Sequence, residues 1–317
     1  MSDFITLGEL LIDFTPSGQA DGRNLFMQNA GGAVANAAAA VAAQGLDVSF
    51  LGMVGDDQFG HFLRDTLREK NIDTSGVILS EEYNTTLAFV HLFENGERDF
   101  SFYRKPGADI MYSAADIDKS KIKSAKVFHF GAVSMADEPS RSATYAGAEF
   151  AIENGLVVSF DPNYRAPLWD SETEAIEHIK NGLALCDIVK IADNEVELLY
   201  GDIPHEHAAQ NLLDMGISQV YITLGNKGAC FANKEGFGFA EGFKANAIDA
   251  TGAGDCFTGS VVSQFIKSGK TLPDYTLQDM EHSAVFANAA ASICVEGKGG
   301  IPSMPKVEQI MQRLNKK

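Results

Sequence analysis

The chain has 317 residues, of which 45% are hydrophobic, so it is long enough for one large α/β domain with a smaller addition. Its formal net charge of −18 repels the phosphate groups of nucleic acids and of anionic membranes, so we expect a partner of neither kind. The sequence has no apolar run long enough for a membrane span, no secretory leader and no CxxC pair among its four cysteines, which predicts a cytoplasmic protein without a zinc site or disulfide framework.

Short apolar strands alternate with helical stretches along most of the chain. The first strand ends at Asp13, a helix is predicted from about Gly32 to Gly45, and a second helix is predicted from about Phe59 to Asn71. The later strands read KVFHFGAV, LVVSFDPN, DIVKIAD and QVYITLG. This rhythm is typical of βαβ units around a largely parallel sheet whose strands are buried between helices.

Two segments break this rhythm and predict a small β-sheet lid. Residues 84–104 alternate in residue type around Asn95-Gly96, which is the strongest short hairpin signal, and residues 16–29 are polar and contain glycine. We therefore predict a core domain of residues 1–15, 30–82 and 106–317, and a lid of residues 16–29 and 83–105. Exposed lid strands can pair with a second subunit, so we also expect a homodimer through the lid.

Polar residues near the start of the chain could bind a hydroxylated ligand. Asp13 stands at the end of a predicted strand, Gly31 and Gly32 allow a ligand to approach the backbone, and Asn36 offers both a donor and an acceptor. A loop acid and a core asparagine are the ordinary alternatives. Arg104 follows the lid hairpin, where it is either solvated surface or positioned over the cleft.

Two later segments could bind a metal ion and a nucleotide. Asn194 and Glu197 are three residues apart and share one helix face, which is plain surface or a position for hydrated Mg²⁺. The turn after QVYITLG and the last long helix could face a nucleotide, through Thr223, Gly225, Gly228 and Asn288. For Asn288, core packing is the alternative.

The stretch DATGAGDCFTGS, residues 249–260, combines glycines and carboxylates where a helix begins. The amino end of a helix exposes unpaired N–H groups and attracts anions. The spelling fits neither a P-loop nor a GxGxxG dinucleotide motif. Asp255 would repel phosphate there, unless it accepts a proton from a hydroxyl that attacks the phosphate. The stretch therefore predicts phosphoryl transfer rather than simple anion binding.

Taken together, these motifs resemble the PfkB or ribokinase-like family of carbohydrate kinases, and within it most closely the fructokinases. The two signature regions are GGAVANAAAAVAAQG and DATGAGDCFTGS, and the fructokinase likeness depends on GELLIDFTP, FYRKPGADIMY and FDPNYRAPLW. The resemblance covers the whole chain. It implies a ribokinase-like three-layer α/β/α core with a mostly parallel sheet, and a β-sheet lid.

The resemblance also implies roles for matching residues. Asp255 would be the catalytic base, and Gly252, Ala253 and Gly254 would form the anion hole. The sugar side would comprise Asp13, Gly31, Gly32, Asn36, Arg104 and Arg165. The nucleotide side would comprise Lys190, Asn194, Thr223, Gly225, Gly228 and Asn288. Glu197 would hold Mg²⁺ through water, and Asp249 and Thr251 would bind a monovalent cation.

The activity that the resemblance implies is transfer of the γ-phosphoryl group from ATP to a sugar hydroxyl, with Mg²⁺ and K⁺ as cofactors. The expected substrate is D-fructose and the product fructose 6-phosphate. Family members that act on aminoimidazole riboside, 2-keto-3-deoxygluconate or ribose are the alternatives. A sugar-binding sensor without catalysis and an oxidoreductase are the alternatives from other classes.

Overall fold

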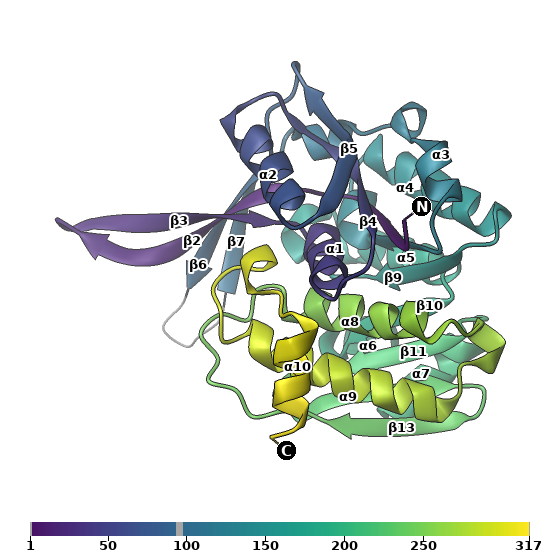
Figure 1. Ribbon diagram of the computed structural model, residues 1–317. Helices are drawn as coiled ribbons and strands as arrows, with labels where there is room; N and C mark the ends of the chain where they lie inside the picture. The colour runs from purple at the N-terminus through teal and green to yellow at the C-terminus, as the bar shows by residue number, and fades with distance from the viewer. Residues whose placement is uncertain (1, 93–97, 317) are drawn as a thin grey trace.

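The computed structural model describes residues 2–92 and 98–316 and has a nine-stranded sheet at its centre (Figure 1). The strand order is β13-β12-β11-β10-β9-β8-β1-β4-β5. Seven strands are parallel: β1 (Phe4–Leu7), β4 (Val48–Gly55), β5 (Ile72–Ser80), β8 (Val127–Gly131), β9 (Val157–Asp161), β10 (Ile188–Ala192) and β11 (Gln219–Thr223). At one edge β12 (Gly228–Asn233) and β13 (Gly236–Glu241) are antiparallel. The predicted α/β class with a mostly parallel sheet is confirmed.

Helices cover both faces of this sheet. One face packs against α1 (Ala33–Ala43), α2 (Gln58–Glu69), α8 (Ala253–Ser268), α9 (Leu277–Cys294) and α10 (Val307–Leu314). The other face packs against α3 (Lys119–Lys123), α4 (Ser140–Glu153), α5 (Glu172–Leu183), α6 (Asp193–Tyr200) and α7 (His205–Asp214). These are the three layers that the resemblance implies. In the part of the chain that the structure describes, no helix is long and apolar enough to pass through a bilayer.

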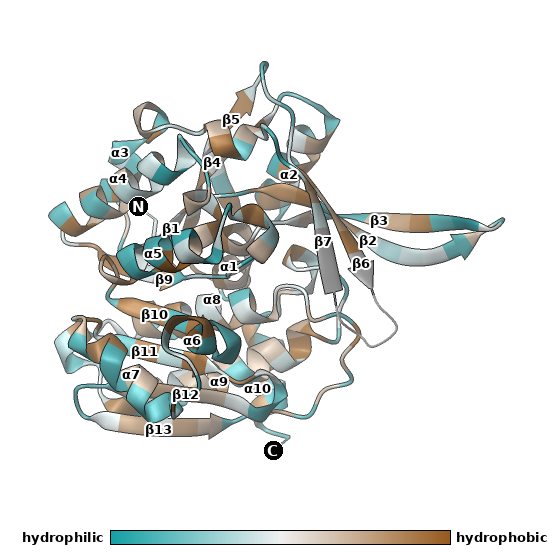
Figure 2. Ribbon diagram, turned by 180° about the vertical axis from the view of Figure 1, so that it is seen from behind, coloured by the Kyte–Doolittle hydropathy of each residue, from teal (hydrophilic) through white to brown (hydrophobic). Residues whose placement is uncertain are grey.

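Successive residues of the central strands supply two separate apolar cores. In β1, Phe4 packs into the core on the α1 and α8 side, whereas Ile5 and Leu7 pack into the core on the α4 and α5 side. All three are at most 1% exposed. Figure 2 shows the same pattern, with brown strands β10 and β11 behind helices such as α6 and α7, which carry teal on their outer surfaces. Burial on both faces explains the near-continuous apolar runs in the sequence.

A second sheet of four strands, in the order β3-β2-β6-β7, projects from the main body (Figure 1). It consists of β2 (Leu11–Ala20), β3 (Arg23–Gly31), β6 (Leu87–Leu92) and β7 (Arg98–Tyr103). The pairing of β6 with β7 is antiparallel, as the hairpin prediction requires, and the turn at Asn95-Gly96 lies outside the described residues. The sheet begins at Leu11, earlier than the predicted lid segment. The division of the chain into a core and a lid domain remains a prediction.

The two faces of the lid sheet have different chemistry. One face carries an aromatic cluster, in which Phe14 stacks on Phe89 at 4.8 Å while Phe26 and Tyr103 contact Phe89 edge-on. Phe26 is 41% exposed and Tyr103 is 66% exposed. Strand alternation places Asp13 on the opposite face, towards the main body.

Helices α1 and α8 lie side by side, and three small residues make this close approach possible. A Cβ atom at Gly259 of α8 would lie 2.7 Å from the carbonyl oxygen of Ala37 in α1 and 2.8 Å from the Cβ of Ala40. The glycine and the alanines therefore let the two backbones come almost into contact. One turn earlier in each helix, this approach brings Asn36 next to Asp255.

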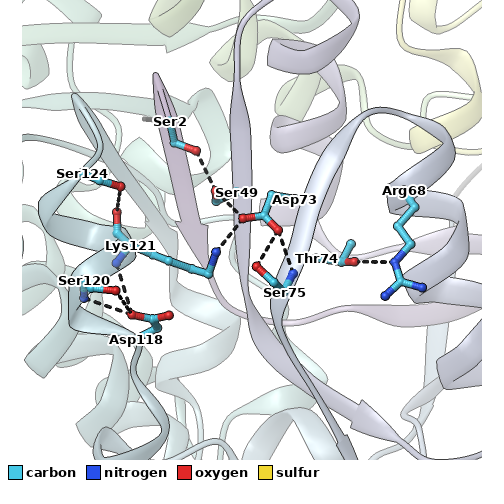
Figure 3. Close-up of polar contacts among 10 residues, drawn as sticks. All are labelled: Ser2, Ser49, Arg68, Asp73, Thr74, Ser75, Asp118, Ser120, Lys121 and Ser124. Carbon is cyan, nitrogen blue, oxygen red and sulfur yellow. Dashed lines mark hydrogen bonds and ion pairs between the residues drawn. The ribbon is translucent and has the colours of Figure 1, made fainter.

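A polar cluster lies at the end of the sheet where the parallel strands β1, β4 and β5 begin (Figure 3). Asp73, near the start of β5, accepts hydrogen bonds from Lys121 Nζ at 2.6 Å and from Ser75 Oγ at 2.6 Å, while Ser49 links it to Ser2. Partial burial alone would raise the pKa of Asp73, but the bonds from Lys121 and Ser75 lower it to about 2. The cluster ties α3 to the edge strand.

Candidate functional site

Two adjoining cavities open where the parallel strands end. The first has a volume of about 360 Å³ and includes the end of β1, the lid, and the starts of α1 and α8 in its walls. The second has a volume of about 830 Å³ and lies between the turn after β11, α9 and the segment 242–247. Ala250 and Gly254 line both cavities, so the amino end of α8 lies at their junction.

The Asp255 carboxylate lies in the wall of the first cavity, in the first turn of α8. It accepts a hydrogen bond from Asn36 Nδ2 at 2.8 Å on one oxygen and from Asn163 Nδ2 at 2.7 Å on the other. Only 6% of the residue is exposed. Burial raises the pKa of Asp255 to about 6, helped by the nearby charge of Asp161 and opposed by Asn36 and Lys190. Asp255 is thus a stronger base than an ordinary aspartate and remains ionised at neutral pH.

The amino end of α8, predicted to form an anion hole through Gly252, Ala253 and Gly254, lies next to one buried lysine. Gly252 is the helix N-cap in the left-handed conformation, with φ of 78°. The N–H of Ala253 donates to the carbonyl of Ala250 at 3.3 Å, and the N–H groups of Gly254 and Asp255 follow in the first helical turn, which has no carbonyl of its own helix to bond. A Cβ at Gly254 would lie 3.0 Å from Lys190 Nζ, so the ammonium group lies directly against this turn. Lys190 also pairs with Asp161 at 3.3 Å. Burial alone would lower the pKa of Lys190, but Asp161, Glu195 and Asp255 raise it overall, so the lysine is charged.

Most of the residues predicted for the sugar side line the first cavity. They are Asp13, Gly32, Asn36 and Arg165. Burial raises the pKa of Asp13 to about 7, although Arg165 lowers it. Gly31 lies behind Asp13: a Cβ there would lie within 2.1 Å of its carboxylate oxygen, so only glycine leaves room for the Asp13 side chain in this position.

Arg104 does not lie over the cleft as an exposed residue. It is 3% exposed, and Phe102, two residues earlier, is in the cavity wall instead. Asp109 holds the guanidinium inside the protein, with Nε donating at 2.8 Å, and Nη2 donates to the carbonyl of Val133 at 3.2 Å. A contact between Arg104 and the sugar remains a prediction.

The segment predicted to hold Mg²⁺ is placed only partly at the cavity. Asn194 lines the first cavity, but Glu197 is exposed on α6 and lies in the wall of neither cavity. Glu195 lines the cavity instead, and its carboxylate accepts the N–H groups of Tyr164 at 2.7 Å and Ala192 at 2.8 Å. Among residues 2–92 and 98–316, no cluster of three His, Cys, Asp or Glu side chains is placed to hold a metal ion. A role for Glu197 remains a prediction.

The second cavity brings together four of the six residues predicted for the nucleotide, namely Thr223, Gly225, Gly228 and Asn288, whereas Asn194 lines the first cavity. Asn288 Nδ2 donates to the carbonyl of Ala240 at 3.0 Å, which ties α9 to β13. Phe243, Phe257 and Val295 supply apolar surface. Lys190, which was predicted for the nucleotide side, is found at the first cavity, next to the shared turn of α8. A role for Lys190 in nucleotide binding remains a prediction.

Asp249 and Thr251 lie beside a third cavity of about 80 Å³ under the lid. The Asp249 carboxylate accepts hydrogen bonds from the N–H of Thr251 at 2.9 Å, from Thr251 Oγ1 at 2.7 Å and from the N–H of Gly299 at 2.9 Å. This carboxylate and neighbouring carbonyl groups are ligand types that a hard monovalent cation accepts. The K⁺ site remains a prediction.

Sequence reasoning missed three polar residues of the first cavity: Glu9, Asn163 and Glu195. Asn163 follows β9 in the motif FDPN, so its place after a parallel strand was a usable signal. Glu9 accepts the N–H of Ala33 at the start of α1, and burial raises its pKa to about 7. Glu195 is adjacent to the predicted Asn194, but spacing alone could not show which of the two glutamates faces inwards.

Comparison with known proteins gives consistent results. The family model described as pfkB family carbohydrate kinase matches residues 1–307. The chain is 38% identical over 305 residues to Probable fructokinase-5 of Arabidopsis thaliana, which covers 95% of this chain and 94% of that protein. The structure of the fructokinase of Xylella fastidiosa with bound ATP superposes with a TM-score of 0.92 at 30% identity, covering 100% of this chain and 99% of that one. A double mutant of the fructokinase of Vibrio cholerae O395, in a form with fructose, ADP and potassium ion bound, has a TM-score of 0.89 at 30% identity and 99% coverage of both chains.

Proposed function

Because this chain belongs to the pfkB family of carbohydrate kinases, we propose that it is a fructokinase, which transfers the γ-phosphoryl group of ATP to D-fructose to form fructose 6-phosphate. The observation that supports it best is the position of the buried Asp255 carboxylate, in the first cavity and next to the turn that this cavity shares with the second. In this arrangement the sugar occupies the first cavity and ATP the second. The sugar hydroxyl and the γ-phosphate then meet at the amino end of α8.

In the proposed mechanism Asp255 takes the proton from the attacking hydroxyl. Asn36 and Asn163 each donate to one of its oxygens, which fixes the orientation of the carboxylate. The O–H bond of the sugar breaks as its oxygen bonds to phosphorus, and the bond from phosphorus to the bridging oxygen of ADP breaks in line. The proton remains on Asp255 until the product leaves.

The transferred phosphoryl group needs stabilisation of its negative charge. The N–H groups at the start of α8 point at its oxygens, and the Lys190 ammonium lies against the same turn. Mg²⁺ bound to the phosphates would supply further neutralising charge; of the predicted pair Asn194 and Glu197, Asn194 lies in the cavity wall. For K⁺, Asp249 and Thr251 would hold the ion in the loop that leads into α8.

Fructose is proposed as the substrate because the similar proteins reported above are fructokinases, one of them with fructose bound. Asp13, Asn36 and Arg165 in the cavity wall are suited to bind several hydroxyl groups. The four cysteines are free and buried, which fits the proposed cytoplasmic location.

A panel of sugars tests the substrate. With ATP and Mg²⁺, we expect kcat/KM for D-fructose to exceed that for ribose, aminoimidazole riboside and 2-keto-3-deoxygluconate by roughly tenfold or more, the scale that a few pocket contacts supply. ADP formation measured with each sugar at equal enzyme concentration gives the comparison. Faster turnover of one of the other three compounds would assign the chain to that substrate within the same family, and turnover of none of the four would reject the fructokinase proposal.

We also propose that the lid forms a homodimer through its aromatic face. Phe26 and Tyr103 are exposed beside Phe14 and Phe89, which gives an apolar surface that a second copy could cover. The variants Phe26→Glu and Tyr103→Glu should shift the mass measured by analytical ultracentrifugation from dimer to monomer. Ile152→Glu, on α4 and 46% exposed, is the control and should leave the mass unchanged. A wild-type monomer at micromolar concentration would contradict the proposal.

A further inference from the structure

The segment 242–250 forms one wall of the second cavity without belonging to a helix or strand. It runs from the end of β13 to the start of α8, and its lining residues are Gly242, Phe243, Lys244, Ala245, Asn246, Ala247 and Ala250. Because no ladder or helical turn holds its backbone, the position of this wall depends on bonds to other elements. We call residues 242–250 the wall segment.

The end of α9 holds the wall segment from one side. The N–H groups of Ile248 and Asp249 donate to the carbonyl of Val295 at 2.7 and 3.1 Å. The N–H of Asn246 donates to Glu296 Oε1 at 3.2 Å. Glu296 itself lines the second cavity, so its carboxylate both holds the wall segment and forms part of the cavity surface.

A single guanidinium group from the last helix joins these parts. Arg313 of α10 pairs through Nη2 with Glu296 Oε2 at 2.6 Å, and through Nη1 donates to the carbonyl of Lys244 at 3.2 Å and to Ser292 Oγ at 3.1 Å. All three partners belong to residues that line the second cavity. Helix α10 itself packs on the outer side of α9 (Figure 1), so Arg313 reaches the wall from behind.

The ion pair between Arg313 and Glu296 affects the charge that the second cavity presents to an anionic ligand. The side chain is 32% exposed, and although partial burial raises its pKa, the hydrogen bond from Arg313 lowers it overall, so the group is ionised. An isolated carboxylate in the cavity wall would repel a triphosphate. Arg313 offsets this charge and at the same time fixes the backbone at Lys244.

We propose that Arg313 is a positioning residue for the nucleotide: it does not touch the nucleotide, but holds the wall segment in place and neutralises Glu296. This inference rests on the proposed kinase function, because it takes the ligand of the second cavity to be a nucleotide. The alternative is that Arg313 only attaches α10 to the body, a task that buried Ile310 already performs in part.

Binding of ADP, measured by titration calorimetry without sugar, distinguishes the two roles. We expect Arg313→Gln to weaken ADP binding about 5- to 20-fold, the scale of a charge-assisted hydrogen-bond network losing one member. KM for ATP should rise in proportion, while KM for the sugar should stay within about twofold, because the first cavity contains none of the partners of Arg313. Arg313→Lys keeps the positive charge but cannot bond all three partners at once. Its affinity for ADP should therefore lie between those of the wild type and Arg313→Gln.

The matched control is Arg141→Gln. Arg141 of α4 pairs with Glu174 at 2.7 Å and donates to two backbone carbonyls, and its side chain is 19% exposed against 21% for Arg313, but it lies on the other face of the sheet. It should lose similar thermal stability and keep ADP affinity. Adding Glu296→Gln to Arg313→Gln should restore part of the lost affinity, since no unpaired carboxylate remains.

Unchanged ADP affinity in Arg313→Gln, or an equal loss in Arg141→Gln, would overturn the inference and leave the kinase proposal intact. Failure of the wild-type protein to bind ADP at all would overturn the kinase proposal itself. If Arg313→Gln does not fold, Arg313→Lys decides between the roles by the same ADP titration.

Discussion

Replacement of Asp255 by asparagine should lower kcat by about 10²–10⁴-fold, the usual contribution of a positioned general base, while ADP binds within a few-fold of the wild-type affinity. The Asp255 carboxylate can accept a proton because, in its ionised form, neither of its oxygens carries one. An amide in the same place cannot take the proton of the sugar hydroxyl. It also presents an NH₂ group to the NH₂ group of either Asn36 or Asn163, so one of the two existing bonds is lost.

Two measurements separate this chemical effect from a loss of structure. Asp73→Asn makes the same change near the start of β5, at the other end of the strands from Asp255, and should leave kcat unchanged. In the wild-type protein, kcat/KM should fall as the pH drops through about 6, since the raised pKa of Asp255 means that the carboxylate form is present above that pH and is lost below it. If Asp255→Asn keeps more than a tenth of the wild-type kcat, Asp255 is not the catalytic base.

Replacement of Gly252 by alanine should lower kcat by about 10²–10³-fold, the typical cost of one lost oxyanion donor. Gly252 has φ of 78°, and a Cβ there would lie 2.8 Å from the Cα of Gly300. Because the obstructing atom belongs to the backbone, the start of α8 has to move. That movement turns the N–H groups away from the phosphoryl oxygens.

Gly269→Ala is a closely matched control on the same helix. Gly269 ends α8 in the left-handed conformation, with φ of 65°, and no atom lies within 4 Å of a Cβ built there. Both variants should therefore lose about 1–2 kcal/mol of stability from backbone strain, but only Gly252→Ala should lose turnover. Equal kcat values in the two variants would show that the geometry of the α8 start is not needed for the reaction.

Local patterns predicted the parts of the site that depend on one segment. The residues 249–260 alone predicted a helix start with an anion site, and the structure begins α8 at Ala253 with Gly252 as N-cap. The strand alternation of residues 84–104 likewise predicted the paired strands β6 and β7. In both cases, the sequence pattern and the structural element that it predicts occupy the same short segment of the chain.

Contacts between distant segments could not be read from one sequence. Asn163 reaches Asp255 across 92 residues, and nothing in FDPN alone specifies that partner. The place of Arg104 after the lid hairpin predicts solvated surface or a position over the cleft, yet Asp109 and the carbonyl of Val133 hold it inside the protein. The choice between Glu195 and Glu197 depends on the rotation of α6 against the cavity, which a helical period does not fix.

Because α1 and α8 are in close contact at Gly259 and Ala37, the spacing of these helices and the shape of the first cavity depend on different residues. The spacing between these helices depends on the contact of Gly259 with the Ala37 backbone and the small Ala40 side chain, and not on the lid side chains that line the first cavity. Substitutions at the lid can therefore reshape the first cavity for another acceptor without altering the distance from Asn36 to Asp255. A scaffold of this kind can diversify its acceptors while the geometry of group transfer stays constant.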